Sequence, residues 1–97
     1  MKIPNKVSVG PFTLKVKVTD DLPNESWGNL VMETGTISIK KSLDHDQQKE
    51  ILLHEMCEGL VRYVCYMMDE KFTHKNFERF NTALYGMLKD NKLNFGE

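Results

Sequence analysis

From Lys6 to Val18 the chain alternates between apolar and polar positions with the period of a β-strand, and Asp20-Asp-Leu-Pro-Asn24 then forms a polar connection. The apolar positions on either side of the turn signal Gly10-Pro11 are Val7, Val9, Phe12, Leu14, Val16 and Val18. Alternation of period two around such a turn predicts a β-hairpin with one buried face. A second hairpin is predicted over 27–40, because Thr34-Gly35 marks a turn and Ile37 and Ile39 share a face.

The pattern then changes to a helical period. Asp44, followed three residues later by Gln47, is suited to cap a helix, which we expect to run from about Asp46 to Asp69. Projected at about 100° per residue, the helix has one broad apolar face. This predicted face comprises Leu53, Met56, Cys57, Leu60, Val61, Val64, Met67 and Met68.

A second helix is predicted from about His74 to Asp90, with Thr73 as its N-cap. Its predicted apolar stripe consists of Phe77, Phe80, Leu84 and Leu88, with Tyr85 beside it. The two halves together predict an α+β fold, in which a small antiparallel sheet of about four strands packs on two C-terminal helices. The 97 residues are expected to form one domain, 1–97, without disulfides or a structural metal.

Composition and charge exclude several classes of function. The chain is 40% hydrophobic and 28% charged, and its formal net charge of -1 gives no sign of binding to nucleic acid or to an acidic membrane surface. The N-terminus lacks the apolar core of a signal peptide, and no apolar run approaches the roughly 20 residues of a membrane span. We therefore expect a cytoplasmic protein.

The two cysteines are expected to be reduced thiols. Cys57 and Cys65 lie eight residues apart on one predicted helix, which separates their backbones by about 12 Å and prevents a disulfide between them. Cys65 is also about 16 Å along the axis from His54, so the two cannot bind one metal ion.

The main candidate for chemistry is the segment Ile51-Leu-Leu-His-Glu-Met-Cys-Glu-Gly-Leu60. His54 and Glu58 lie four residues apart, hence on one face of a helix, where an imidazole and a carboxylate can share a metal ion. In the metallopeptidase pattern H-E-x-x-H both His residues bind zinc, and the Glu activates the bound water. Here Glu58 replaces the second His, and a carboxylate oxygen is also an acceptable zinc ligand.

The order of the predicted elements resembles small bacteriophage proteins of the ImmA/IrrE-like zinc metallopeptidase group. The resemblance covers roughly residues 27–91 and depends on Leu52-Leu-His-Glu55 and on Leu84-Tyr85 followed by Asp90-Asn91. It implies a minimal zincin-like fold and a cytoplasmic location, in the host if the chain is phage-encoded.

Residue by residue, the resemblance implies His54 as the first zinc ligand, Glu55 as general base and Glu58 in place of the second His. The third ligand in such proteins is an acidic residue on the following helix, for which Glu78 is the candidate and His74 the reserve. Two carboxylates and one imidazole make the zinc less electrophilic than two imidazoles and one carboxylate, so the substitution at Glu58 predicts a zinc site with degenerate activity.

Each candidate residue also has an interpretation without a metal. Glu58 can form an ordinary helical ion pair with Arg62, four residues later, and Glu78 can face solvent near Lys75 or Arg79. His54 and Glu55 can be solvated residues at the margin of the core.

Two functions follow. The first is a zinc-dependent peptidase-like domain acting on a protein or peptide, which a chain this short would need to receive as a loop presented by a partner protein. The alternative is a non-catalytic protein-binding module on the same scaffold that modulates a host or phage regulator. The sequence leaves the oligomeric state open.

Overall fold

Four strands form one sheet in the computed structural model, which describes residues 2–65 and 73–93. The strands are β1 (Lys6–Val9), β2 (Phe12–Thr19), β3 (Gly28–Val31) and β4 (Thr36–Lys40), with a short 3-10 turn, η1 (Pro23–Glu25), before β3. β1 pairs with β2 and β3 pairs with β4, both antiparallel. Both predicted hairpins are therefore confirmed.

The centre of the sheet differs from the prediction. The strand order is β1-β2-β4-β3, and β2 and β4 run parallel, so the expectation of an antiparallel sheet is wrong for this pair. Ile37 and Ile39 on β4 are 0% exposed, which suits a central strand. β3 contains Gly28 and the exposed Val31, which suit an edge. The more buried strand of the second hairpin, β4, therefore lies beside β2 in the middle of the sheet. The segment that follows β2 crosses to the far edge, where β3 begins.

Helix α1 (His45–Gly59) begins as predicted. Asp44 Oδ1 accepts a hydrogen bond from Gln47 N at 2.8 Å, and Gln47 Oε1 accepts one from Asp44 N at 3.2 Å. This reciprocal pair satisfies two backbone donors that a helix start otherwise leaves free. After Gly59 the chain continues as one wider π-helical turn, η2 (Leu60–Val64), so the regular α-helix ends earlier than expected. The predicted end at Asp69, with Met67 and Met68, lies outside the described residues.

The side of α1 that meets the sheet is rotated from the predicted face. Leu52, Met56 and Leu60 are 0% exposed, whereas Leu53 and Cys57 are only half-buried. Gly59 allows close approach, because a Cβ there would lie 3.2 Å from a methyl group of Val9. Since three apolar residues follow one another at 51–53, the sequence alone does not fix which one faces the core, and this rotation places residue 55 toward the sheet.

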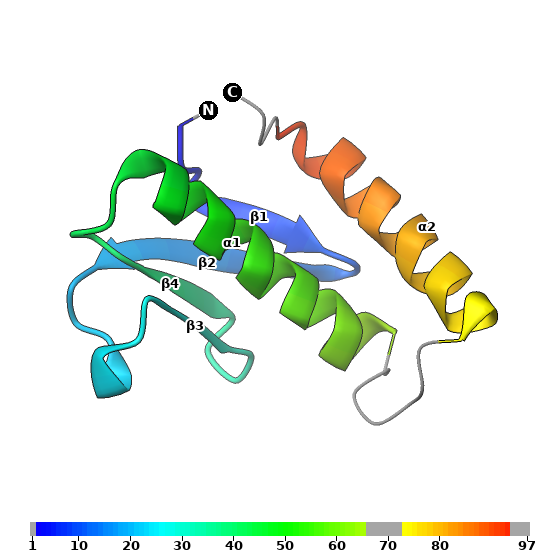
Figure 1. Cartoon of the computed structure of the whole chain (residues 1–97), viewed down its shortest axis with the longest axis horizontal. Coiled ribbons are helices and arrows are strands. Elements are labelled where there is room, and N and C mark those ends of the chain that lie inside the picture. The colour runs from blue at the N-terminus through cyan, green and yellow to red at the C-terminus, as the bar shows by residue number, and fades with distance from the viewer. Residues whose placement is uncertain (1, 66–72, 94–97) are drawn as a thin grey trace.

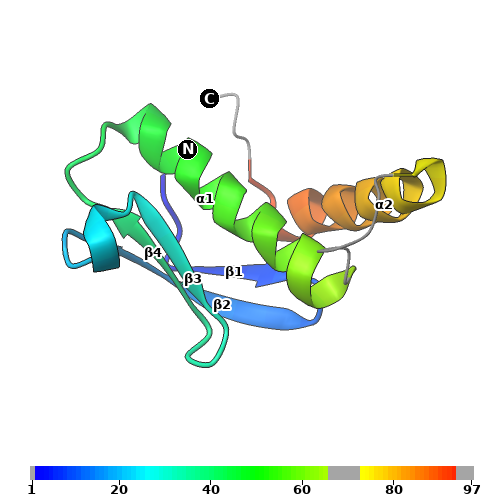
Figure 2. The same ribbon diagram turned by 60° about the horizontal axis from the view of Figure 1, so that its bottom comes forward.

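Helix α2 (His74–Asn91) matches the predicted span, and Thr73 Oγ1 accepts from Asn76 N at 3.2 Å as the expected N-cap. Its buried side is also rotated, because Phe77 is 47% exposed while Met87 is 3% exposed. The residues of α2 that pack on the core are Phe80, Ala83, Leu84 and Met87. α2 packs on β1 and η2, beside α1 (Figures 1 and 2).

Both helices cover the same face of the sheet, which makes the fold a two-layer α+β arrangement (Figure 2). The buried cluster between the layers includes Val7, Val9, Leu14, Val16, Ile37, Ile39, Leu52, Met56, Leu60 and Met87. Within the described ranges, neither helix combines the length and the apolar character that a bilayer crossing requires.

Candidate metal site

One group of potential metal ligands lies on α1. His54, Glu55 and Glu58 each offer a ligand atom, and these three atoms lie within 4.8 Å of one another. The helix brings them together, because residues four apart share a face and residue 55 lies at the edge of that face. Imidazole nitrogen and carboxylate oxygen are both zinc ligands. Donor atoms this close can reach one ion after modest side-chain rotation.

Glu58 is already engaged with a cation of the chain itself. Arg62 Nη1 donates to Glu58 Oε1 at 3.1 Å, which confirms the i,i+4 pairing expected in the absence of a metal. The other oxygen, Oε2, lies 3.6 Å from His54 Nε2. Glu58 therefore links the imidazole to the guanidinium, and a metal ion must compete with Arg62 for this carboxylate.

Glu55 occupies the most unusual environment in the group. It is 5% exposed, and its Oε2 atom is buried without a hydrogen-bond partner in the described part of the chain. Burial raises the pKa of Glu55 above that of an ordinary glutamate, the charge of Glu58 raises it further, and His54 lowers it in part. A carboxylate with a raised pKa accepts a proton more readily than an exposed glutamate does.

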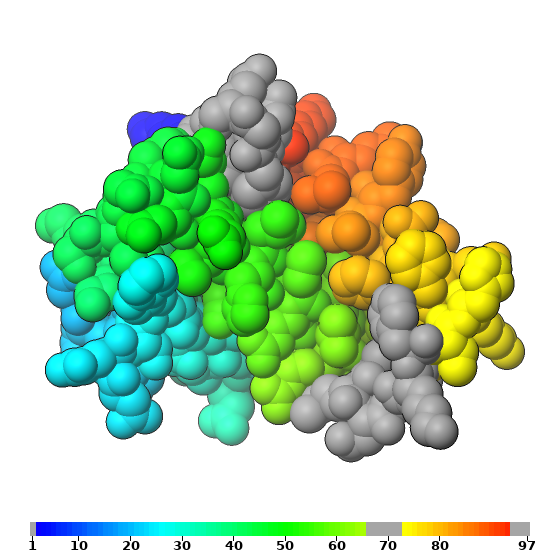
Figure 3. Space-filling model, in the orientation of Figure 1, coloured from blue at the N-terminus to red at the C-terminus, as the bar shows by residue number. Residues whose placement is uncertain are grey.

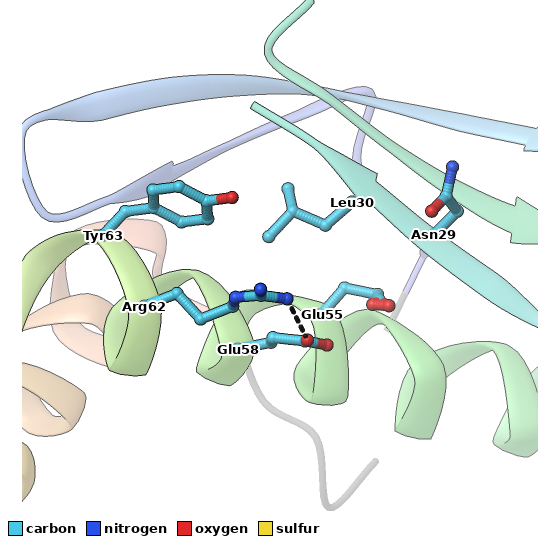
Figure 4. Close-up of a pocket in the computed structure, with 6 residues that line it drawn as sticks. All are labelled: Asn29, Leu30, Glu55, Glu58, Arg62 and Tyr63. Atoms are coloured by element: carbon cyan, nitrogen blue, oxygen red, sulfur yellow. Dashed lines mark hydrogen bonds and ion pairs between the residues drawn. The ribbon is translucent and has the colours of Figure 1, made fainter. Parts of the chain in front are cut away.

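The buried carboxylate lines a small pocket between α1 and the edge strand β3. The pocket has a volume of about 120 Å³, and its lining residues are Asn29, Leu30, Glu55, Glu58, Arg62 and Tyr63. In Figure 4 the Tyr63 ring lies at one end and Asn29 at the other, and Glu55 and Glu58 from α1 and Arg62 from η2 project along one side. The volume suffices for a few water molecules or one small polar group, but not for a large side chain.

His54 lies on the solvent side of the group, away from the pocket that Glu55 lines. Its side chain is 68% exposed, against 36% for Glu58. It borders a shallow, open depression with Cys57, Glu58 and Val61. In the space-filling view α1 remains uncovered along its outer side, between the β3 region and α2 (Figure 3). The imidazole is therefore accessible to solvent, whereas Glu55 is buried and lines the pocket.

The structure does not bring Glu78 or His74 to this group. His74 Nε2 and Glu78 Oε1 lie 2.9 Å apart and are 85% and 65% exposed. Neither belongs to the cluster of ligand atoms around His54. The placement of the helices explains this separation. His74 and Glu78 are in the first turns of α2, and this end of α2 lies away from the middle of α1 (Figures 1 and 2). The third potential ligand of the group is therefore Glu55 rather than Glu78 or His74.

Cys57 and Cys65 are free thiols, as expected, with Cys65 buried and Cys57 half-buried. Burial raises the pKa of both thiols, and Arg79 partly opposes this for Cys65. Neither thiol belongs to the ligand group.

The sequence analysis missed the pocket itself. Asn29 and Leu30 come from β3, more than twenty residues before the motif, and no pattern in the sequence ties them to α1. The one available signal was Gly28, whose absent Cβ lets Ile51 of α1 lie against the strand.

No protein-family model, curated protein or solved structure matches this chain. The resemblance to the ImmA/IrrE-like group therefore stays a prediction from the sequence.

Proposed function

We propose that this chain is a zinc-binding, metallopeptidase-like domain of minimal zincin-like design, in which His54 and Glu58 hold the ion and Glu55 lies beside it. The observation that carries the proposal is the convergence of three ligand atoms, from an H-E-x-x-E motif, within 4.8 Å on α1. Glu78 has no part in this version of the site, since it pairs with His74 on α2.

Glu55 is the residue that we expect to accept a proton beside the bound zinc. A bound zinc supplies a Lewis acid that polarises water or a carbonyl group. The raised pKa of Glu55 and its unpartnered oxygen suit it to accept a proton from a polar group in the pocket. Because only one imidazole is available, the ion carries more anionic ligand charge than in a site with two His residues, and we expect slow hydrolysis or none.

Metal analysis tests the proposal directly. Protein purified without added zinc should bind about one equivalent when titrated by calorimetry, and His54→Ala should lose at least about tenfold in affinity, the loss of one ligand interaction of about 1.4 kcal/mol. His74→Ala is the matched control, because it removes an exposed imidazole from the other helix. Failure of the wild type to take up zinc, or equal losses in the two variants, would remove this function.

Glu55→Gln separates the two roles that Glu55 can have. If Glu55 acts as general base, zinc affinity is kept while cleavage of an unfolded protein substrate is lost. If it is the third ligand, zinc affinity falls as it does in His54→Ala. In the second case the domain binds metal without a base and is not a peptidase.

The second candidate is a non-catalytic module that binds a protein partner. It is favoured by the Arg62–Glu58 ion pair, which neutralises Glu58 without a metal, and by a pocket of only about 120 Å³. It predicts that His54→Ala and Glu55→Gln both keep partner binding in a pull-down from the native host. Loss of partner binding in either variant, with the fold intact by circular dichroism, would contradict it.

A further inference from the structure

The charges of this chain are unevenly distributed between the strands and helix α1, although the net charge is only -1. The four strands contain no acidic residue, and their four cations are Lys6, Lys15, Lys17 and Lys40. Helix α1 carries the opposite balance, with four acidic residues, Asp46, Glu50, Glu55 and Glu58, and one lysine. The overall count therefore conceals four cations on the strands and an excess of acidic residues on α1.

The four lysines lie on the face of the sheet that the helices leave open. Val7, Leu14, Val16, Ile37 and Ile39 point into the core, so the alternate positions point the other way. Lys6, Lys15 and Lys17 are exposed, and Lys40 is half-exposed. The positions between them carry hydroxyl groups, at Ser8, Thr13, Thr36 and Ser38. We call these eight residues the lysine face.

The register brings like charges close together. Lys6 is directly opposite Lys15 in the β1–β2 pair, where Cβ atoms lie about 5 Å apart and like charges are destabilising. Lys15 and Lys17 are about 7 Å apart along β2. Within the described ranges, no ion pair joins any of the four lysines to an acidic side chain. The face therefore has an uncompensated positive potential, which an external anion would relieve.

We propose that the lysine face binds the phosphate backbone of a nucleic-acid duplex without reading its sequence. Lysine ammonium groups act as point charges toward phosphate, and serine and threonine hydroxyls are common additional donors to phosphate oxygens. A row of cations at spacings of about 5 to 7 Å can follow a phosphate backbone, and binding then gains free energy from released counterions.

The composition of the face argues against other anionic partners. Single-stranded nucleic acid is held mainly by stacking on a series of aromatic rings, and none of the eight residues is aromatic; the exposed Trp27 lies only at one end, where Lys40 N donates to its backbone oxygen. Protein partners are anchored by a central cluster of Trp, Tyr or Arg, and none of these occupies the middle of the face. Stable adhesion to an anionic membrane combines basic residues with apolar groups that insert, which the eight residues do not supply.

Fluorescence anisotropy with a labelled DNA duplex of about 20 base pairs, at low salt, tests the proposal. The logarithm of the binding constant should fall with the logarithm of salt concentration with a slope of about -3 to -4, as expected for three or four phosphate contacts. The double variant Lys15→Glu/Lys17→Glu should bind at least about tenfold more weakly. Lys75→Glu/Lys89→Glu on α2 makes the same change in net charge and should lose at most about threefold.

Three results would overturn the inference: no duplex binding at low salt, equal losses in the two double variants, or binding only of an acidic polypeptide or of anionic vesicles in the same assay. All four substituted lysines are exposed, and circular dichroism verifies that both variants remain folded. The result is independent of the metal site, because none of the lysines belongs to the group around His54.

Discussion

The side-chain amide of Asn91 forms two hydrogen bonds with the backbone of Ser8. Ser8 N donates to Asn91 Oδ1 and Asn91 Nδ2 donates to Ser8 O, each at 2.7 Å. Asn91 Nδ2 also donates to Met87 O within α2. The amide thus pairs with the free edge of β1 as a neighbouring strand would, and it fixes the last turn of α2 to a residue 83 positions earlier.

Asn91→Ala should therefore lower the free energy of unfolding by about 1–3 kcal/mol, because it leaves half-buried backbone groups of Ser8 without partners. Urea denaturation of wild type and variant measures the change. Asn81→Ala, at an exposed position of the same helix, is the control and should shift stability by less than about 0.5 kcal/mol. Equal changes in the free energy of unfolding for the two substitutions would mean that the Asn91–Ser8 hydrogen bonds do not stabilise the fold.

Glu55→Gln should make the protein more stable at neutral pH and reduce the pH dependence of stability. Burial raises the pKa of Glu55, so the folded state binds its proton at pH values where the unfolded chain has released it. Wild-type stability therefore falls as the pH rises from about 4.3, where an unfolded glutamate titrates, through the higher pKa of the folded state. The gain in Glu55→Gln should appear above this range and vanish below it.

Urea denaturation of metal-free protein at pH 4 and pH 7.5 measures that difference. Glu50→Gln, at an exposed position of α1, controls for the general loss of a carboxylate. A gain of the same size at both pH values would show that it does not come from titration of Glu55.

Arg62→Gln should raise zinc affinity about two- to fivefold. The guanidinium holds Glu58 Oε1 at 3.1 Å, and an exposed or half-exposed pair of this kind contributes about 0.2–1 kcal/mol that the metal must overcome. Isothermal titration of both proteins measures the ratio, with Lys75→Gln as a control for the loss of one positive charge. An unchanged or lower affinity in Arg62→Gln would show that the ion pair does not compete with the metal.

Gly86→Ala should raise the free energy of unfolding by about 0.5–1 kcal/mol. Gly86 lies inside α2, and a Cβ placed there meets no atom within 4 Å in the described structure, so alanine gains helix propensity without a clash. Gly28→Ala should have the opposite effect, because its Cβ would collide with Ile51 of α1. Thermal unfolding distinguishes the two, and destabilisation by Gly86→Ala would reveal a contact made by this face of α2.

The sequence predicted the elements well because their signals are local. Both hairpins, the Asp44–Gln47 cap and the Thr73 cap depend on residues close together in the chain, and all are present. The apolar faces of the helices were less well predicted. Apolar residues at 51–53 and at 77, 80, 83, 84, 87 and 88 allow more than one rotation, and contact with the sheet selects one.

For the candidate site, the sequence determined the spacing of His54, Glu55 and Glu58, because one helical turn brings such residues together whatever surrounds them. Only the tertiary structure decided that Glu55 is buried against β3, that α2 holds Glu78 away from the site, and that β4 lies parallel to β2. These features depend on contacts between segments far apart in the chain. A hydrophobic pattern specifies that a face is buried, but it does not specify which segment covers it.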